Sequence, residues 1–504
     1  MSSERALSLR GGHCPATRTL RLRNRILSWS TSAMRRGTRY GLCYVGRSSL
    51  KLRFRCNDRS DRRKADPVNA GDVIAPKLPR SRISKFPKRL RRAAFFEQLG
   101  PGLVTGAADD DPSGIATYSQ AGAQFGFNML WTMILTYPLM TAVQLVSAQI
   151  GRVTGCGLAK NIGDVFPKPL VLVLIGLLFI ANTINIGANL AAMGSAVELV
   201  IGWGGHIFTV AFALVSLTLQ LFISYERYAK YLKWLTLVLL AYVAVVFVAK
   251  VDWDAAVAGL VTPKIALTSD SLTVVVAIFG TTISPYLMFW QSSQEVEEIQ
   301  QHANARPLKK RPRQAPREFR RIRIDTFIGM AVSNIVAIAI MMSTAATLHA
   351  QGKTDITTAA DAAEALRPIA GNLAFALFSL GIIGTGLLSL PVLAGSAAYA
   401  FGESQGWKCG LENKPWEAVG FYCVIIAATV LGIGIDFSSL DPIKALFWSA
   451  VINGFVAVPV MAAMMWVGSR RDQMGRFTVA PLTLTLGWAT TAIMAAAAIA
   501  MLLF

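Results

Sequence analysis

Apolar runs of about 20 residues recur along the chain, and each has the length that a helix needs to cross a bilayer. The chain is 53% hydrophobic with a mean hydropathy of +0.45, whereas a soluble helical protein would carry more charge between its helices. The pattern therefore predicts an all-α polytopic membrane protein with eleven spans. They lie near 99–125, 129–150, 169–199, 207–224, 230–249, 271–294, 326–349, 371–402, 416–434, 443–467 and 477–504.

Three carboxylates interrupt the first predicted span. Asp109, Asp110 and Asp111 are followed by Pro112, and Gly114 comes two residues later. A charge at the membrane centre costs roughly 2.5–3.5 kcal/mol, so such residues usually mark a functional site. Pro and Gly do not continue a regular helix, and a broken helix at membrane depth is how transporters offer oxygen atoms to a cation.

The sixth predicted span contains a second break, Gly280-Thr281-Thr282-Ile283-Ser284-Pro285-Tyr286. Taken alone, it is better explained as a proline kink whose free backbone groups bond to neighbouring hydroxyls. Breaks five spans apart instead indicate two five-helix repeats with a site at the membrane midplane. The predicted repeats cover about 93–250 and 265–467, and an extra helix covers about 477–504.

Basic residues alternate between the predicted loops. The even-numbered loops hold 20 Lys and Arg, and the odd-numbered loops hold five. The positive-inside rule then places the N-terminus in the cytoplasm and the C-terminus outside. The predicted location is the plasma membrane, or the inner membrane if the source is bacterial, and the lipid bilayer is the predicted surrounding.

Residues 1–92 differ in composition from the eleven-helix domain predicted over 93–504. They hold 25 of the 50 Lys and Arg but only 5 of the 29 Asp and Glu. Four hypotheses remain for this basic tail: a disordered cytoplasmic segment, a start codon placed too far upstream, a transit peptide, or a segment that binds anionic lipid or RNA. Aromatic stacking residues are sparse in the tail, so no nucleic-acid partner is predicted.

Other function classes lack the residues they need. No GxxxxGK[ST] motif is present, which argues against an ATP-driven pump. An intramembrane aspartyl protease needs a second Asp in another span, and the nearest option, Asp436, lies at a predicted helix end. The chain is therefore not expected to be an enzyme. The sequence does not predict an oligomeric state.

The motifs of the first and sixth spans resemble those of the NRAMP divalent-metal transporters. The resemblance rests on Leu99-Gly100-Pro101-Gly102, Asp111-Pro112, the segment 120–126 (QAGAQFG), the break at 280–285 and Arg323-Ile324-Asp325-Thr326, and it covers roughly 93–504. It implies a LeuT-type fold: two inverted five-helix repeats and an eleventh helix, with helices 1 and 6 broken at the midplane.

The departures from the family pattern concern the ion site. By resemblance, Asp111 is the metal-binding carboxylate and Thr281 supplies a backbone carbonyl. Gly114 stands where the family has Asn, and Ser284 stands where it has Met. The predicted metal residues are thus Asp111, Thr281, Ser284 and Gly114, an oxygen-only donor set with space for a partly hydrated ion. Hard oxygen donors suit Mg²⁺ and Mn²⁺. The pattern is most similar to the NRAMP-related magnesium transporters.

These residues predict a secondary transporter of divalent cations (Mg²⁺, Mn²⁺ or both) that works by alternating access without proton coupling. The family passes protons through sixth-helix His residues and acids of the third helix. Here Tyr286 and Gln291 replace the His residues, and the third span carries amides that do not titrate. The alternatives are a proton-coupled Mn²⁺/Fe²⁺ symporter and a LeuT-fold transporter of another solute. No cofactor is expected; the metal ion is the cargo.

Several further polar residues are candidates for the ion path. Asp109 and Asp110 either attract the ion or face an aqueous vestibule, and both could still carry protons. The acids at 295, 297 and 298 either concentrate exiting cations or form a solvated face. The remaining candidates lie within predicted spans. The complete set is Asp109, Asp110, Gln291, Asn453 and Glu295.

Overall fold

The structure, a computed structural model, describes residues 105–223 apart from 107, 236–263, 268–437 apart from 303, and 441–503. All regular elements in these residues are helices. The longer ones are α3 (Pro112–Phe125), α4 (Trp131–Thr154), α6 (Lys168–Ile201), α7 (Gly205–Phe222), α9 (Leu240–Val248), α10 (Trp253–Val261), α11 (Ser269–Thr282), α12 (Pro285–Gln301), α13 (Ala315–Thr347), α16 (Ala374–Gln405), α17 (Val419–Asp436), α18 (Pro442–Ser469) and α20 (Pro481–Leu503). Short helices lie in the connections: α5 (Leu158–Gly163), α14 (Ala359–Glu364), α15 (Arg367–Ala370) and α19 (Arg471–Met474).

The all-helical polytopic prediction is confirmed. Within the described ranges, nine helices are long and apolar enough to cross a membrane. The other two predicted spans are represented by α3 and by the shorter apolar helix Leu237–Val248, and parts of both spans lie outside the described residues. The predicted basic tail, 1–92, also lies outside them. The seventh helix begins at Ala315, well before the predicted position 326, because its first turns are polar and hydropathy detects only the apolar part.

Helix ends follow local sequence rules. The helices α4 and α6 end at Gly155 and Gly202, which take φ angles of 74° and 91°. Glycine adopts this left-handed conformation without the steric cost that a Cβ brings, so it is the usual residue after the last helical turn.

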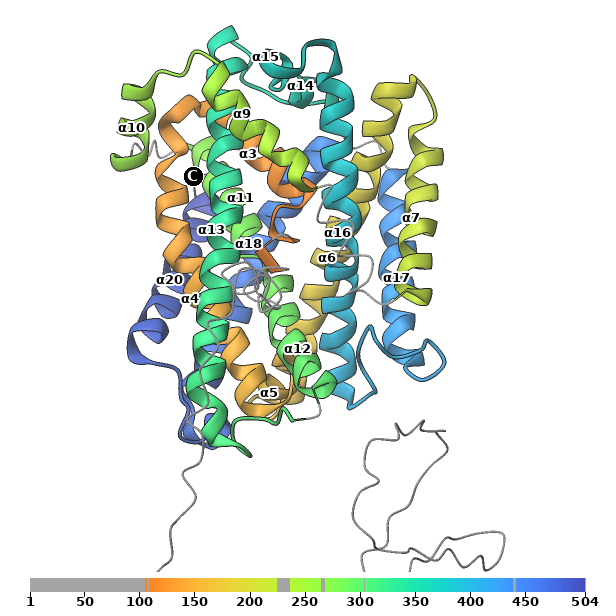
Figure 1. Ribbon diagram of the computed structural model, residues 1–504, viewed down its shortest axis with the longest axis vertical. Helices are drawn as coiled ribbons and strands as arrows, with labels where there is room; N and C mark the ends of the chain where they lie inside the picture. Colours follow the sequence, from red (N-terminus) through yellow and green to blue (C-terminus); the bar gives the residue numbers. More distant parts are fainter. Residues whose placement is uncertain are drawn as a thin grey trace, which may run out of the picture. The chain divides into compact units, whose positions relative to one another are not determined.

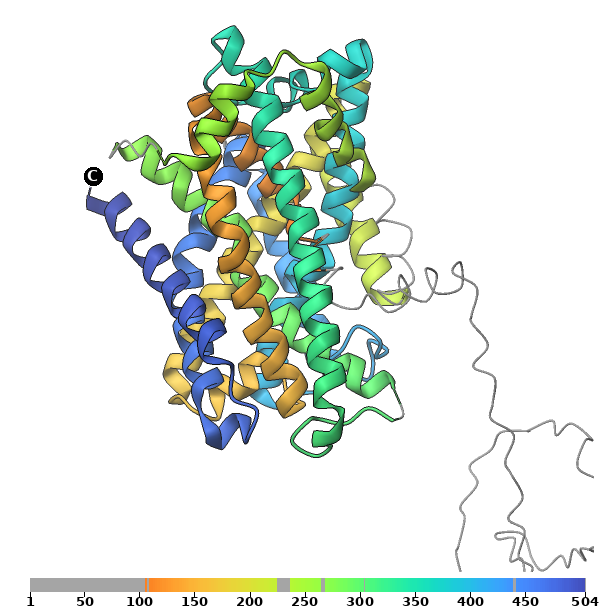
Figure 2. The ribbon, with the colours of Figure 1, turned by 60° about the vertical axis from the view of Figure 1, so that its left-hand side comes forward.

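The two halves of the chain pack with exchanged partners. The helix α3 of the first half packs against α13 of the second, and α12 of the second half packs against α4 of the first. The helix α6 packs against α16, which holds the corresponding position in the other half. Figures 1 and 2 show these helices as one upright bundle. This exchange is what a two-fold relation between two repeats produces.

The outside of the bundle is apolar and its centre is not. Large side chains such as Phe222 and Phe247 are 76% exposed, which suits contact with lipid. By contrast, 94% of the apolar window in Ser269–Gln301 is buried inside the protein. The broken sixth helix is therefore the most enclosed span, and the breaks lie where helices surround them.

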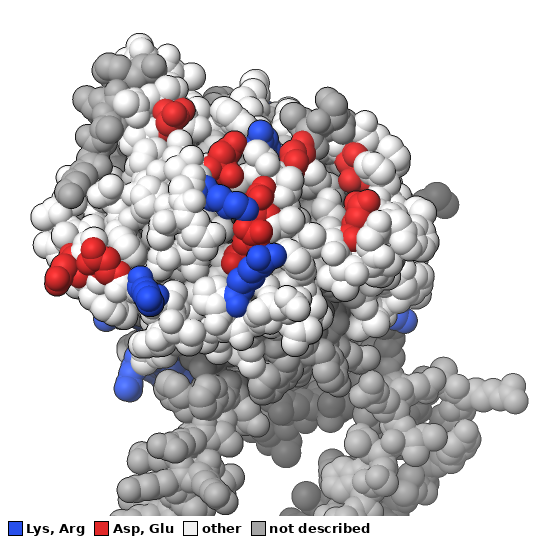
Figure 3. Space-filling model, turned by 90° about the horizontal axis from the view of Figure 1, so that it is seen from above, with Lys and Arg blue, Asp and Glu red and all other residues white. Residues whose placement is uncertain are grey.

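The two ends of the bundle differ in charge. The short helices α14 and α15 lie at one end and α5 at the other (Figure 1). At the α14 end, the connections and adjoining helix ends carry nine acidic and four basic residues among those described, and Figure 3 shows this face. The acidic residues are Glu198, Asp252, Asp254, Asp270, Asp355, Asp361, Glu364, Asp436 and Asp441.

The crossing of α11 and α18 depends on glycine and yields a stability prediction. A Cβ on Gly280 would lie 2.0 Å from the carbonyl oxygen of Ala450 and 2.5 Å from the backbone nitrogen of Gly454. We expect Gly280→Ala to force these helices apart and to cost roughly 1–3 kcal/mol. A thermal melt of the purified protein in detergent measures the loss.

The matched control is Gly434→Ala in α17, where nothing lies within 4 Å of the added carbon. This variant should melt at or slightly above the wild-type temperature, since alanine favours a helix over glycine by about 1 kcal/mol. Equal melting temperatures for the two variants would contradict the close approach of α11 and α18.

Candidate metal-ion site

Asp111 ends the first break by capping the helix that follows. Its backbone is extended (φ −76°, ψ 169°), and Pro112 occupies the first helical position of α3. One carboxylate oxygen, Oδ1, accepts hydrogen bonds from the Ser113 hydroxyl (2.6 Å) and the Gly114 amide (2.9 Å). Aspartate before proline is a favourable helix start, and the positive end of α3 stabilises the carboxylate. The local sequence Asp-Pro-Ser-Gly is thus sufficient to position this side chain.

The second carboxylate oxygen of Asp111 accepts fewer hydrogen bonds than the first. Oδ2 accepts a single hydrogen bond from the Asn185 amide of α6, at 3.3 Å. Asn185 in turn accepts from the Ser449 hydroxyl of α18 at 3.2 Å. All these side chains are buried. Because Oδ1 already has two donors, Oδ2 is the oxygen that can ligate a cation.

The second break exposes a backbone carbonyl. In a continuous helix, the Thr281 carbonyl would accept from the backbone N–H of residue 285, but Pro285 has none. The Ser284 hydroxyl lies 2.7 Å from both the Thr281 and the Gly280 carbonyl oxygens, and its one proton serves one of them at a time. Thr281 O and Ser284 Oγ both keep lone pairs, so this turn can offer two neutral oxygens.

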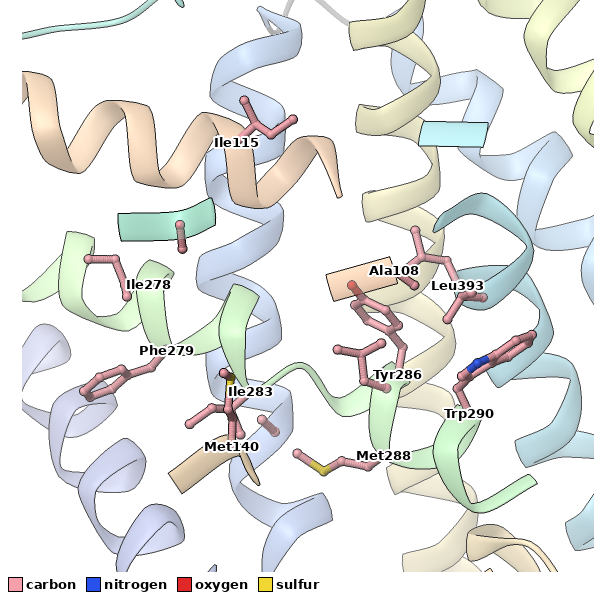
Figure 4. Close-up of a cluster of buried hydrophobic side chains, with 14 of the residues drawn as sticks. Ala108, Ile115, Met140, Ile278, Phe279, Ile283, Tyr286, Met288, Trp290 and Leu393 are labelled. Carbon is pink, nitrogen blue, oxygen red and sulfur yellow. The ribbon is translucent and has the colours of Figure 1, made fainter. Parts of the chain in front are cut away.

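The two breaks lie against each other. The hydroxyls of Ser113 and Thr281 are 3.5 Å apart, and those of Tyr118 and Thr282 are 3.3 Å apart. Figure 4 shows the side chains around the second break, with the Tyr286 ring directed toward the segment that contains Ala108. The structure therefore brings together all four residues predicted for the site: Asp111, Gly114, Thr281 and Ser284.

The expected open space at Gly114 is not present in this conformation. A Cβ there would lie 3.3 Å from both Thr281 Oγ1 and the Tyr118 ring. The prediction that the missing Asn side chain leaves room for a hydrated ion is wrong at this position, because the Thr281 hydroxyl and the Tyr118 ring occupy that space. Gly114 contributes its amide to Asp111 and allows the breaks to meet.

Asp109 and Asp110 converge on a seventh-helix serine. Ser333 Oγ lies 2.6 Å from Asp109 Oδ2 and 2.9 Å from Asp110 Oδ1, and both carboxylates are buried. One hydroxyl proton satisfies only one carboxylate at a time. Asp109 is fully enclosed and Asp110 is 6% exposed, so the interpretation that they face an aqueous vestibule does not fit this conformation.

The second half of the sixth span, α12, is tied to its neighbours by polar contacts. Gln291 is buried, and its Oε1 accepts a hydrogen bond from Thr105, which precedes the first break. This contact joins the segment before the first break to the helix after the second break. Gln291 is thus close to the first helix, and its role in the ion path stays a prediction.

Glu295 belongs to a buried ion-pair network instead of a solvated face. Its side chain is 0% exposed and receives a charge-assisted hydrogen bond from Arg321 of α13. Arg152 of α4 lies 2.6 Å from Glu318, which Arg321 also contacts at 3.2 Å. The solvated-face interpretation is wrong for Glu295, because these arginines bury it. Glu297 also has partners, the Tyr399 hydroxyl and the Leu411 amide.

Asn453 lies buried in α18, next to Gly454, which approaches the second break. Both its amide atoms lack hydrogen-bond partners within the described structure. These atoms are therefore available to line an ion path, and the role of Asn453 in such a path stays a prediction.

Three partners of the site were not predicted from the sequence. Asn185 is one of several amides in the third span, while Ser333 and Ser449 are ordinary serines in apolar helices and carry no distinguishing pattern.

A thioether also lies near the first break, since Met193 of α6 packs beside Gly386 and Pro112. Among the residues with described positions, no three His, Cys, Asp or Glu side chains group as a metal site. Any ion here would rely on one carboxylate and neutral oxygens.

Comparisons with known proteins identify the family of the chain. Residues 102–504 match the family described as Nramp, natural resistance-associated macrophage protein-like. The divalent metal cation transporter MntH of Pectobacterium carotovorum is 25% identical over 403 residues, covering 78% of this chain and 91% of that protein. MntH of Klebsiella pneumoniae subsp. pneumoniae is 26% identical over 426 residues, covering 82% and 95%.

Solved structures share the fold. The Eremococcus coleocola manganese transporter matches with a TM-score of 0.63 at 17% identity, covering 80% of this chain and 86% of that one. Mhp1, a nucleobase-cation-symport-1 family transporter, matches with a TM-score of 0.51 at 13% identity, covering 80% and 91%. The predicted LeuT-type fold is confirmed by these matches.

The Glu295 network leads to a second stability prediction. Removing one partner of a buried ion pair leaves the other charge uncompensated, at a cost of roughly 3–5 kcal/mol. We expect Glu295→Gln to lower the melting temperature strongly. The control is Asp164→Asn, which breaks the exposed Lys160–Asp164 pair and should cost less than about 1 kcal/mol. Similar melting temperatures for both variants would mean that Glu295 is solvated.

Proposed function

The chain belongs to the Nramp family of divalent metal cation transporters, and we propose that the ion it carries best is Mg²⁺, with Mn²⁺ also accepted. The observation that carries the proposal is the oxygen-only donor set at the two breaks. Asp111 Oδ2, the Thr281 carbonyl and the Ser284 hydroxyl contain no sulfur and no imidazole. Carboxylate, carbonyl and water ligands favour hard cations, and Mg²⁺ usually keeps several waters.

A second candidate is the carriage of Mn²⁺ or Fe²⁺ coupled to protons. The names of the relatives favour only the Mn²⁺ part of this candidate: several are MntH proteins, called divalent metal cation transporters, and one solved structure is called a manganese transporter. Mn²⁺ accepts the same oxygen donors as Mg²⁺. The donor set therefore distinguishes Mg²⁺ from softer ions, but it distinguishes Mg²⁺ from Mn²⁺ less well. Competition between ions is therefore the decisive measurement.

The proposal of alternating access is supported by the enclosure of the site. Asp111 is 0% exposed, and Thr281 and Ser284 are each 1% exposed. On the inner side, Gln291 and Glu295 tie α12 to the first helix and to α13. On the α14 side, Gln120 of α3 accepts from the Ile356 amide at 2.9 Å. An ion reaches the site only when contacts on one side release while those on the other hold.

Transport without proton coupling is supported by the third helix of the bundle. In α6, the side chains nearest Asp111 are amides, and Asn185 contacts its carboxylate directly. Amides hydrogen-bond without changing charge, so they cannot pass a proton by titration. We propose that the ion gradient and the membrane potential drive the flux.

The proposed orientation places the α14 end outside and the α5 end in the cytoplasm. The predicted loops at the α5 end hold most of the Lys and Arg of the membrane domain, whereas acids outnumber bases at the α14 end. Positive residues stay on the cytoplasmic side during insertion. An acidic outer face would also raise the local concentration of cations.

Ion flux into proteoliposomes tests the proposed substrate. Wild type should take up Mg²⁺ and Mn²⁺, and Fe²⁺ should compete poorly. Asp111→Asn keeps a capping side chain but removes the charge, so flux should fall by about 100-fold or more while the melting temperature changes little. The control is Asp436→Asn, which alters a buried acid paired with His206 at a helix end. Strong Fe²⁺ uptake without Mg²⁺ uptake would refute the Mg²⁺ proposal.

Proton coupling is tested separately in the same vesicles. With a pH-sensitive dye inside, Mn²⁺ uptake should leave the internal pH unchanged, and an imposed pH gradient should not accelerate it. A membrane potential that is negative inside should accelerate uptake, because each cycle carries charge. Acidification that tracks metal entry would support the proton-coupled alternative instead.

A further inference from the structure

Three asparagines follow one face of α6 beside the first break. Asn182, Asn185 and Asn189 are spaced three and four residues apart, so they lie on the same side of the helix, and all are 0% exposed. Two of them have clear partners. The Asn182 amide donates to the Leu393 carbonyl and the Ser396 hydroxyl of α16, both at 2.8 Å, and Asn185 donates to Asp111.

Asn189 is different because neither of its amide atoms has a hydrogen-bond partner. The side chain approaches the Asp111 carboxylate without reaching hydrogen-bond geometry. The neighbouring residues on this face locate it at the break. Asn185, one turn before, contacts Asp111, and Met193, one turn after, packs near Pro112.

An unpaired amide in this position is costly unless something binds it. Leaving a buried donor or acceptor unsatisfied costs about 1–3 kcal/mol, and a leucine would fill nearly the same volume without that penalty. The carboxylate oxygen Oδ2 of Asp111 faces the same α6 surface. The Asn189 amide therefore brings a neutral, hard oxygen donor close to the place where a cation on Asp111 would lie.

We propose that Asn189 is an ion-binding residue, whose Oδ1 contacts the hydrated divalent cation held by Asp111, while Asn185 positions the carboxylate. The inference rests on the proposed function. A neutral oxygen has a specific advantage over a second carboxylate here. The number of charged ligands sets how tightly a site holds a divalent cation, and a carrier must also release its ion.

Two substitutions of Asn189 test the contact in opposite directions. Binding of Mg²⁺ and of Mn²⁺ is measured by calorimetry on the purified full chain, and flux is measured in proteoliposomes. Asn189→Leu removes the oxygen and should weaken Mg²⁺ binding about tenfold, the loss of one moderate contact. Asn189→Asp keeps an oxygen and adds a charge, so it should tighten binding of both ions about tenfold or more and slow their release.

Asn182→Leu is the matched control, since it removes a buried amide of the same helix whose hydrogen bonds go to α16. It should lower the melting temperature and leave both dissociation constants within about twofold of wild type, because it lies away from Asp111. If Asn189→Leu does not fold, Asn189→Asp decides the question. Unchanged dissociation constants in folded Asn189→Asp would overturn the inference. A wild-type protein that neither binds nor carries divalent cations would instead refute the proposed function.

Discussion

The hydrogen bonds from Ser113 and Gly114 to Asp111 hold a carboxylate inside the protein, far from water. A buried carboxylate is stable only when donors, dipoles or a cation compensate its charge. Here the start of α3 provides the donors, because a Pro after the Asp ends the preceding turn and starts the next helix. The same local chemistry leaves Oδ2 directed toward α6 and α18. The break, the cap and the ion site are thus one feature.

Close backbone approach makes the rest of the site possible. Gly280 lets α11 meet α18, Gly114 lets α3 meet the second break, and Gly106 lies against the backbone of Gly329 in α13. In lipid, helices gain little from hydrophobic association, so small residues that allow tight packing stabilise such crossings. Gly106 thus allows close contact between the two repeats, and Gly280 allows close contact between two helices of the second repeat beside the break. A larger residue at any of these glycines would push the packed helices apart. The oxygen atoms of the site would then move away from each other although the atoms themselves are unchanged.

The fold was largely predictable from the sequence, and the site was predictable in part. Apolar length located the helices, and the polar residues beside Pro112 and Pro285 located both breaks, because proline removes a backbone donor and the polar groups mark a site. The partners of the carboxylates were not predictable. Ser333 and Ser449 are ordinary serines in apolar helices, and their importance depends on which helices cross. The prediction of a solvated face for Glu295 is wrong for a similar reason, since Arg152 and Arg321 reach this carboxylate only in the folded bundle.

The proposed absence of proton coupling has a structural requirement. A carrier that moves an ion downhill must return through its closed state without that ion, so Asp111 must be tolerated in the interior without a cation. A proton would neutralise the carboxylate, but it would also couple transport to pH. The donors of Ser113, Gly114 and Asn185 offer another route, because they are hydrogen-bonded to the buried carboxylate in this closed conformation. Replacing titratable groups by amides beside the site thus stabilises the returning carrier while leaving its charge unchanged.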